Sequence, residues 1–189
     1  KAWWTDEPVL HILPHWNLDG HEGEKVSIWV YSNCDEIQLT VNGHRLERKK
    51  MPKNGHLEWT ATYKPGYVKA TGYKNGRKVM EERIETTGKA VRSETTYETI
   101  GDITIATIKM LDDKGRFVPT ACEKVNFNID GSWCILGWGN GDPAFQHIER
   151  PFRTSLSATS TSGTLTPDRS AQSIEILTFN GLAQVILQK

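Results

Sequence analysis

Apolar and polar residues alternate over long parts of the chain, and the alternation is clearest over 26–30 and 37–41. Side chains that recur at every second position share one face of a β-strand, so each stretch predicts a half-buried strand. The second stretch ends in Asn42-Gly43, a sequence typical of a two-residue hairpin turn, because both central residues need a positive φ. Since neither strand can bury its apolar face alone, the pair predicts a second, facing sheet.

The same pattern, interrupted by turn residues, recurs to the end of the chain, and no segment shows the period of an amphipathic helix. Turns divide 1–88 into about seven predicted strands, as in one immunoglobulin-like sandwich. In the strand that begins at Ile103 the alternation changes phase near Ala106, which indicates either a bulge or a strand covered on both faces. The sequence therefore predicts an all-β chain of two tandem immunoglobulin-like β-sandwich domains, 1–88 and 89–189, the second with a long loop over 144–170.

The net charge of the chain is zero, because its 23 Lys and Arg residues balance its 23 Asp and Glu residues. Nucleic acids and anionic membranes bind concentrated basic surfaces, so neither is a predicted partner. No apolar run reaches the roughly 20 residues that a membrane-spanning helix needs. Because the chain begins at Lys1 rather than at an initiator methionine or a signal peptide, we expect a fragment of a longer protein.

Metal ligation is not indicated by the cysteines or the histidines. The three cysteines, Cys34, Cys122 and Cys134, lack paired ligand spacing, which favours free thiols and leaves a disulfide between the last two as the alternative. His11 and His15 are four residues apart, but the proline between them opposes the helix that would bring them together. The sequence therefore predicts no metal site and no cofactor.

The glycine-rich stretch Gly139-Asn140-Gly141-Asp142 is predicted to be a structural loop. A phosphate-binding loop would need a helix directly after it, and none is indicated. We interpret the glycines as backbone positions that need a positive φ or a close chain approach, with Asn140 and Asp142 bracing the turn through side-chain to backbone hydrogen bonds. A bound Ca²⁺ is the disfavoured alternative, because few other oxygen ligands cluster nearby in the sequence.

Seven tryptophans in this chain predict aromatic cores, an aromatic recognition surface, or both. Trp29 shares its strand face with Ser27 and Tyr31, on the side away from the apolar positions. Two aromatic side chains on an outer face indicate either a surface covered by another domain or a platform for sugar rings, whose axial C–H groups stack on aromatic faces. The candidate carbohydrate or interface aromatics are Trp3, Trp4, Trp16, Trp29, Tyr31, Trp133 and Trp138.

Several short segments stand out in order along the chain, at 30–33, 36–43, 86–88, 139–143 and 179–186. Taken together, and in this order over nearly the whole chain, they resemble the C-terminal immunoglobulin-like β-sandwich domains of glycoside hydrolase family 2, the β-galactosidase-like enzymes of Bacteroidetes type. Each segment alone contains residues that are common in turns of many proteins, whereas the ordered set is specific for this family.

The resemblance implies a non-catalytic C-terminal accessory region of a glycoside hydrolase, a β-galactosidase, whose partner is the catalytic domain of the same polypeptide. In that family two glutamates of a (β/α)₈ barrel cleave the glycosidic bond, and no such position maps onto this chain, so no catalytic residue is predicted. Neighbouring carboxylates such as Asp112-Asp113 are expected to be solvated, because no apolar pocket is indicated around them. The resemblance also implies a periplasmic or extracellular location.

Two further functions stay open from the sequence. The first is a carbohydrate-binding module that uses exposed tryptophans, and the second is a cell-surface adhesion repeat, for which the chain offers only its fold.

Overall fold

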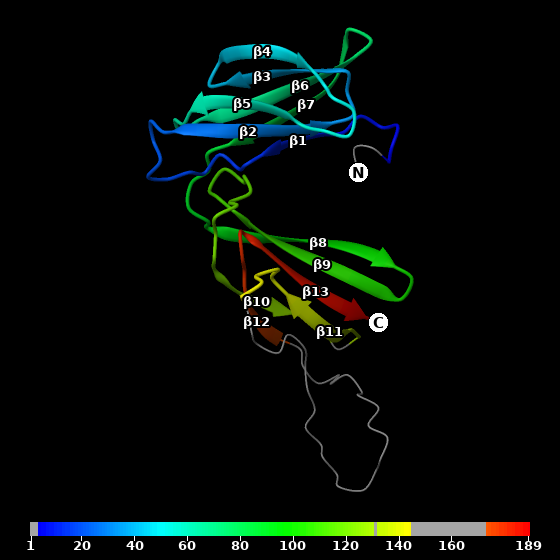
Figure 1. Cartoon of the computed structure of the whole chain (residues 1–189). Coiled ribbons are helices and arrows are strands. Elements are labelled where there is room, and N and C mark those ends of the chain that lie inside the picture. The colour runs from blue at the N-terminus through cyan, green and yellow to red at the C-terminus, as the bar shows by residue number, and fades with distance from the viewer. Residues whose placement is uncertain (1–3, 131, 145–172) are drawn as a thin grey trace, which may run out of the picture. The chain divides into compact units, whose positions relative to one another are not determined.

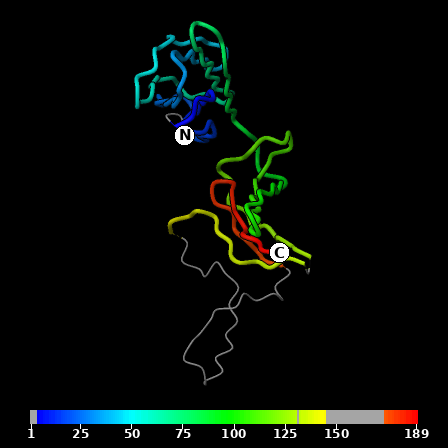
Figure 2. The backbone as a smooth tube through the Cα atoms, turned by 90° about the vertical axis from the view of Figure 1, so that its right-hand side faces the viewer, coloured from blue at the N-terminus to red at the C-terminus, as the bar shows by residue number. Residues whose placement is uncertain are grey.

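The computed structural model describes residues 4–130, 132–144 and 173–189. These residues form thirteen strands and no helix, which confirms the all-β prediction (Figure 1). The chain divides into two compact units, Lys1–Thr87 and Gly88–Lys189. Figure 2 follows the backbone through the first unit from blue to green and through the second from green to red.

The first unit contains two antiparallel sheets, with strand orders β1-β2-β5 and β4-β3-β6-β7. Its strands are β1 (Leu10–Leu13), β2 (Lys25–Ser32), β3 (Glu36–Val41), β4 (His44–Lys50), β5 (Leu57–Thr62), β6 (Tyr67–Lys74) and β7 (Arg77–Glu85).

The alternation in the sequence builds the core of this unit. Ile28 and Val30 of β2 are fully buried and belong to one apolar cluster with Ile37 and Leu39 of β3, which lies in the other sheet. The hairpin between β3 and β4 has Asn42 at φ 47°, followed by a glycine at φ 86°, which confirms the predicted turn. A facing pair of sheets thus covers the apolar faces that neither sheet could bury alone.

The second unit also contains two antiparallel sheets, of unequal size, with orders β11-β13-β9-β8 and β10-β12 among the described residues. Its strands are β8 (Arg92–Ile100), β9 (Ile103–Leu111), β10 (Lys124–Asn128), β11 (Cys134–Gly139), β12 (Ser173–Leu177) and β13 (Leu182–Gln188). The predicted loop over 144–170 lies, after Ala144, outside the described residues.

β9 contradicts the predicted bulge, because it pairs residue by residue with β8 and β13 without a register shift. Thr104 and Ala106 are buried on its inward face, whereas Ile105 on the other face is only half-buried. Thr104 tolerates burial because its hydroxyl shares a 2.9 Å hydrogen bond with that of Thr99. A satisfied polar residue in an inward position therefore produced the apparent change of phase.

All three cysteines are free thiols, with Cys34 and Cys134 buried and Cys122 exposed, so the alternative disulfide is not formed. No helix that could cross a membrane occurs in the parts of the chain that the structure describes.

Candidate functional site

A pocket of about 320 Å³ lies in the second unit and takes residues from both of its sheets. β8, β9 and β13 contribute on one side, and β10 with the chain between β10 and β11 contributes on the other. The lining residues are Tyr97, Thr104, Phe127, Asn128, Ile129, Asp130, Trp133 and Leu187.

The pocket exists because the smaller sheet leaves part of the larger one uncovered. Tyr97 of β8 is paired with Ala106 of β9, and directly paired residues of antiparallel strands point to the same face. Ala106 is fully buried in the core, so Tyr97 also lies on the inward face of the sheet. Its side chain is nevertheless 62% exposed, which places an open aromatic wall at this end of the unit.

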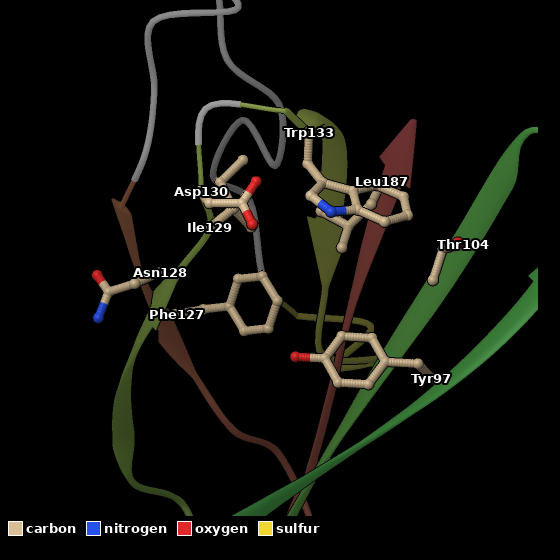
Figure 3. A pocket seen from close by; sticks show the side chains of 8 residues that line it. All are labelled: Tyr97, Thr104, Phe127, Asn128, Ile129, Asp130, Trp133 and Leu187. Carbon is tan, nitrogen blue, oxygen red and sulfur yellow. The ribbon is translucent and has the colours of Figure 1, made fainter. Parts of the chain in front are cut away.

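The floor of the pocket is apolar and its walls are aromatic. Phe127, Thr104 and Leu187 are each buried, whereas Trp133 is half-buried and packs against the same apolar cluster. Figure 3 shows the Tyr97 hydroxyl pointing toward the Phe127 ring. No hydrogen bond links that hydroxyl to another described residue, so it is available to a ligand.

Asp130 gives the pocket a fixed negative charge. The Ser132 hydroxyl and the Ser132 N–H, the latter at 3.0 Å, both donate to its Oδ1, and these bonds lower the pKa of the carboxyl despite an opposing desolvation. Lys189 lowers that pKa further through its charge, and its Nζ lies 6.0 Å from the Trp133 ring centroid. Within the described residues, Asp130 Oδ2 accepts no hydrogen bond, so an ionised oxygen remains available.

A second group of aromatic side chains, here called the Trp29 cluster, consists of Trp29, Tyr31 and His56 on the outer face of the β1-β2-β5 sheet. Trp29 is 41% exposed and stacks on His56 with ring centroids 4.7 Å apart, and Tyr31 lies 5.3 Å from the same imidazole. The Trp29 Nε1–H donates to Ser27 Oγ at 3.1 Å, and the Ser27 hydroxyl donates to Glu58. This bond lowers the pKa of Glu58 most, and the chain of contacts fixes the indole against the sheet.

Of the other predicted aromatics, the three that the structure describes belong to neither group. Trp16 is 1% exposed and packs edge-on to Tyr63 in the core, with ring centroids 5.1 Å apart. Its ring is not accessible to a ligand, so its prediction as a surface aromatic is wrong. Trp4 is 94% exposed, and Trp138 is half-buried against the core of the second unit. Trp3 lies outside the described residues.

The glycine-rich loop begins at Gly139, the last residue of β11, and contains a network of local hydrogen bonds. Asn140 is buried, donates from Nδ2 to the carbonyl of Leu177 at 3.0 Å, and accepts the N–H of Asp142 at 3.0 Å. Asp142 in turn accepts the N–H two residues later, and Gly141 has φ 78°. These hydrogen bonds brace the loop from within, and the described residues contain no group of three or more His, Cys, Asp or Glu side chains that could hold a metal ion.

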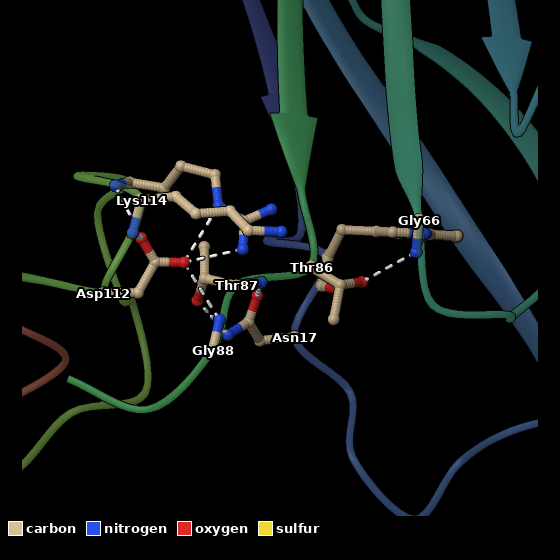
Figure 4. Close-up of polar contacts among 9 residues, drawn as sticks. Asn17, Gly66, Thr86, Thr87, Gly88, Asp112 and Lys114 are labelled. Atoms are coloured by element: carbon tan, nitrogen blue, oxygen red, sulfur yellow. Dashed lines mark hydrogen bonds and ion pairs between the residues drawn. The ribbon is translucent and has the colours of Figure 1, made fainter.

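Asp112 lies outside both groups, and the structure contradicts its predicted solvation, because it is fully buried. Burial opposes its ionisation, but hydrogen bonds from Arg116, then from the backbone of Arg116 and of Gly88, hold the pKa of this carboxyl well below its usual range. The Gly88 N–H donates to Oδ2 at 3.1 Å (Figure 4). The signal available in the sequence was the arginine four residues later, within one tight turn.

In the first unit, Asn17 fixes Thr87 in a similar way. The Thr87 N–H donates to Asn17 Oδ1 at 3.0 Å, and Asn17 Nδ2 donates to the Thr87 hydroxyl at 2.7 Å (Figure 4). Asn17 is buried, so its amide is satisfied by these contacts rather than by water.

The chain is similar to part of several known glycosidases. The family described as "Domain of unknown function (DUF4982)" matches residues 23–80. The β-galactosidase BoGH2A of Bacteroides ovatus is 36% identical over 149 residues, which cover 74% of this chain and 17% of that enzyme. A putative β-glucuronidase of Formosa agariphila is 31% identical over 153 residues, which cover 76% of this chain and 15% of the relative.

Solved structures of glycosidases match the whole chain, among them two from Bacteroides species. A glycosyl hydrolase family 2 member from Bacteroides cellulosilyticus superimposes with a TM-score of 0.73 and 26% identity, over 100% of this chain and 26% of that one. A β-glycosidase from Bacteroides vulgatus gives a TM-score of 0.78 at 24% identity, over 100% of this chain and 22% of that one, and supports the fold. The chain thus spans about a quarter or less of the proteins that it matches.

Proposed function

We propose that this chain, a relative of glycoside hydrolase family 2 enzymes of Bacteroidetes type, is a non-catalytic accessory region of such an enzyme. The family resemblance expected from the sequence is confirmed by the curated and structural relatives. The observation that carries the proposal is coverage: all of this chain matches 26% of a family 2 structure, so most of that enzyme lies outside the matched region.

The fold supports a role in architecture. Each unit has two antiparallel sheets with an apolar cluster of its own, which is the arrangement of a β-sandwich. We infer that both units are immunoglobulin-like sandwiches arranged in tandem, with boundaries close to 1–88 and 89–189.

The state of the carboxylates supports a non-catalytic role. Retaining glycosidases need two carboxyls about 5–5.5 Å apart, one of them kept protonated by a raised pKa. Hydrogen bonds lower the pKa values of Asp112 and Asp130, the wrong direction for a general acid. Burial raises the pKa of Glu82, but the group beside it is His11, whose Nδ1 lies 3.6 Å from Glu82 Oε1, rather than a second carboxyl.

The Trp29 cluster supports contact with another domain of the same polypeptide. Its rings are partly exposed, and Trp29 is held against the sheet by its stack on His56 and its bond to Ser27. A preorganised aromatic surface loses little side-chain entropy when it is covered, which favours burial against a partner. The proposed partner is the catalytic domain.

The test is to delete this region from the full-length polypeptide. We expect a lower melting temperature, with the turnover number per folded molecule retained within about tenfold, since the deletion removes support and no reacting group. A folded deletion variant with no turnover of β-galactosides and β-glucuronides would contradict the proposal.

A further inference from the structure

We propose that the pocket of the second unit binds one end of a neutral saccharide, an uncharged pyranoside of one or two rings. This goes beyond the accessory role, because a region that only supports a catalytic domain needs no ligand. The proposal rests on three independent features of the pocket: its aromatic walls, its ionised rim and its size.

The aromatic walls suit the apolar face of a sugar ring. A pyranose presents several C–H groups on one face, and these carry a partial positive charge that is attracted to the negative face of an aromatic ring. Tyr97 and Trp133 come from separate parts of the fold and line the same pocket, with the buried Phe127 between the sheets. A ring that enters the pocket therefore meets aromatic carbon from more than one direction.

The rim supplies the polar contacts that distinguish a sugar from a simple apolar ligand. Sugar hydroxyls donate hydrogen bonds, and the ionised Asp130 offers Oδ2 as a charge-assisted acceptor. The Tyr97 hydroxyl can both donate and accept.

The fixed charge of Asp130 also sets specificity. A uronic acid carries a carboxylate, and placing it beside the ionised Asp130 would be repulsive. Lys189, whose Nζ lies 6.0 Å from the Trp133 ring centroid, acts on Asp130 through its charge but donates no hydrogen bond to it among the described residues, so it offsets the negative charge without replacing the carboxylate. A neutral glycoside is therefore favoured over a glucuronide that differs only at C6.

The size of the pocket limits the ligand. At about 320 Å³ it lies at the lower end of the range for small-molecule sites. It therefore accommodates the end of a glycan rather than a long internal stretch, and we expect an affinity of order millimolar.

The test is a titration of the isotopically labelled 189-residue chain, followed by amide and indole N–H resonances. The probes are methyl β-galactoside, methyl β-glucoside and methyl β-glucuronide, each to about 50 mM. We expect the Trp133 indole N–H to shift with at least one neutral glycoside and not with the glucuronide. Tyr97→Ala should weaken this binding by about fivefold or more, and it should fold because the side chain is largely exposed on an edge strand.

The matched control is Trp29→Ala, which removes an exposed aromatic from the other unit and should leave the titration unchanged. The proposal is overturned if no neutral glycoside shifts the Trp133 resonance, if Tyr97→Ala binds as well as the parent chain, or if the glucuronide binds equally. None of these results bears on the accessory role, which is tested by deletion in the full-length polypeptide.

Discussion

Arg116 and Asp112 form an ion pair with a fully buried carboxylate, in which Nη2 lies 2.6 Å from Oδ2. The Arg116 Nε donates to the same oxygen at 2.9 Å, and the Arg116 and Lys114 N–H groups donate to Oδ1. Because Oδ2 also accepts the N–H of Gly88, one carboxylate joins the turn after β9 to the first residue of the second unit. This buried, fully bonded group makes the turn sensitive to substitution.

Asp112→Asn should destabilise the second unit, because it removes the charge that the partly buried Arg116 is paired with. We expect the melting temperature to fall by more than about 5 °C, measured by circular dichroism. The neighbouring Asp113→Asn, at an exposed position, is the matched control and should change the melting temperature little.

The lowered pKa of Asp112 means that its stabilisation is present above its ordinary pKa and is lost as pH falls below about 4. The melting temperature should therefore fall less steeply with decreasing pH in Asp112→Asn than in the parent chain. If the two melting temperatures fall by the same amount as the pH is lowered, this assignment is wrong.

Glu82 should show the opposite pH dependence. Burial raises its pKa against the opposing charge of His11, and no described group is hydrogen-bonded to its buried Oε2. A raised folded pKa contributes stability below the unfolded pKa that is lost as pH rises through the folded value. Glu82→Gln should therefore gain stability relative to the parent chain between about pH 4 and pH 7, by a few degrees in melting temperature. The exposed Glu47→Gln is the control, and an identical pH profile for the two variants would argue against a raised pKa at Glu82.

Two tryptophans of the first unit should respond very differently to truncation. Trp16 is buried against Tyr63, so Trp16→Ala should cost about 3–5 kcal/mol in the free energy of unfolding of the isolated chain. Trp29 lies on the outer face, and Trp29→Ala should cost less than about 1 kcal/mol in the same measurement. If Trp29 packs on the catalytic domain, its substitution should lower the free energy of unfolding of the full-length polypeptide more than that of the isolated chain. Urea denaturation of both proteins measures the two values. Equal costs in the two contexts would remove Trp29 from the proposed interface.

Alanine substitutions at two glycines with the same backbone conformation distinguish the cost of backbone strain from the cost of a steric clash. Gly76 and Gly181 have φ 75° and 76°, and a Cβ at Gly76 would meet nothing within 4 Å, whereas one at Gly181 would overlap the carbonyl oxygen of Val118. Gly76→Ala should therefore cost about 1 kcal/mol of backbone strain. Gly181→Ala should cost more than about 2 kcal/mol, because the backbone of Val118 cannot rotate away as a side chain would. Chemical denaturation of both variants measures the difference, and equal costs would contradict this packing.

The sequence predicted the all-β fold well, because strand patterning and turn chemistry are local. The hairpin at Asn42 and the hairpins at Asn75 and Asn180 all have the positive φ that an Asn-Gly pair favours. Burial was harder to predict where polar atoms are satisfied by distant partners. Trp16 was grouped with surface aromatics, but its Nε1–H reaches the carbonyl of Lys64 at 3.2 Å, which allows it to enter the core.

The pocket could be predicted only in part. Trp133 was a candidate from its residue type, whereas Tyr97 was not, because its exposure follows from the small size of the β10-β12 sheet opposite it. Asp112 was expected to be solvated, and its burial depends on Arg116 and on the N–H of Gly88, 24 residues earlier. Contacts of this kind are long-range and leave no periodic signal in the sequence.

The central claim is that the glycosidase chemistry of the relatives lies outside this chain. The most direct measurement is hydrolysis of nitrophenyl β-galactoside and nitrophenyl β-glucuronide by the purified 189-residue chain, with its folding verified by circular dichroism. We predict no release of nitrophenol above the buffer rate for either substrate. Turnover by the pure folded chain that is lost on heat denaturation would contradict the account.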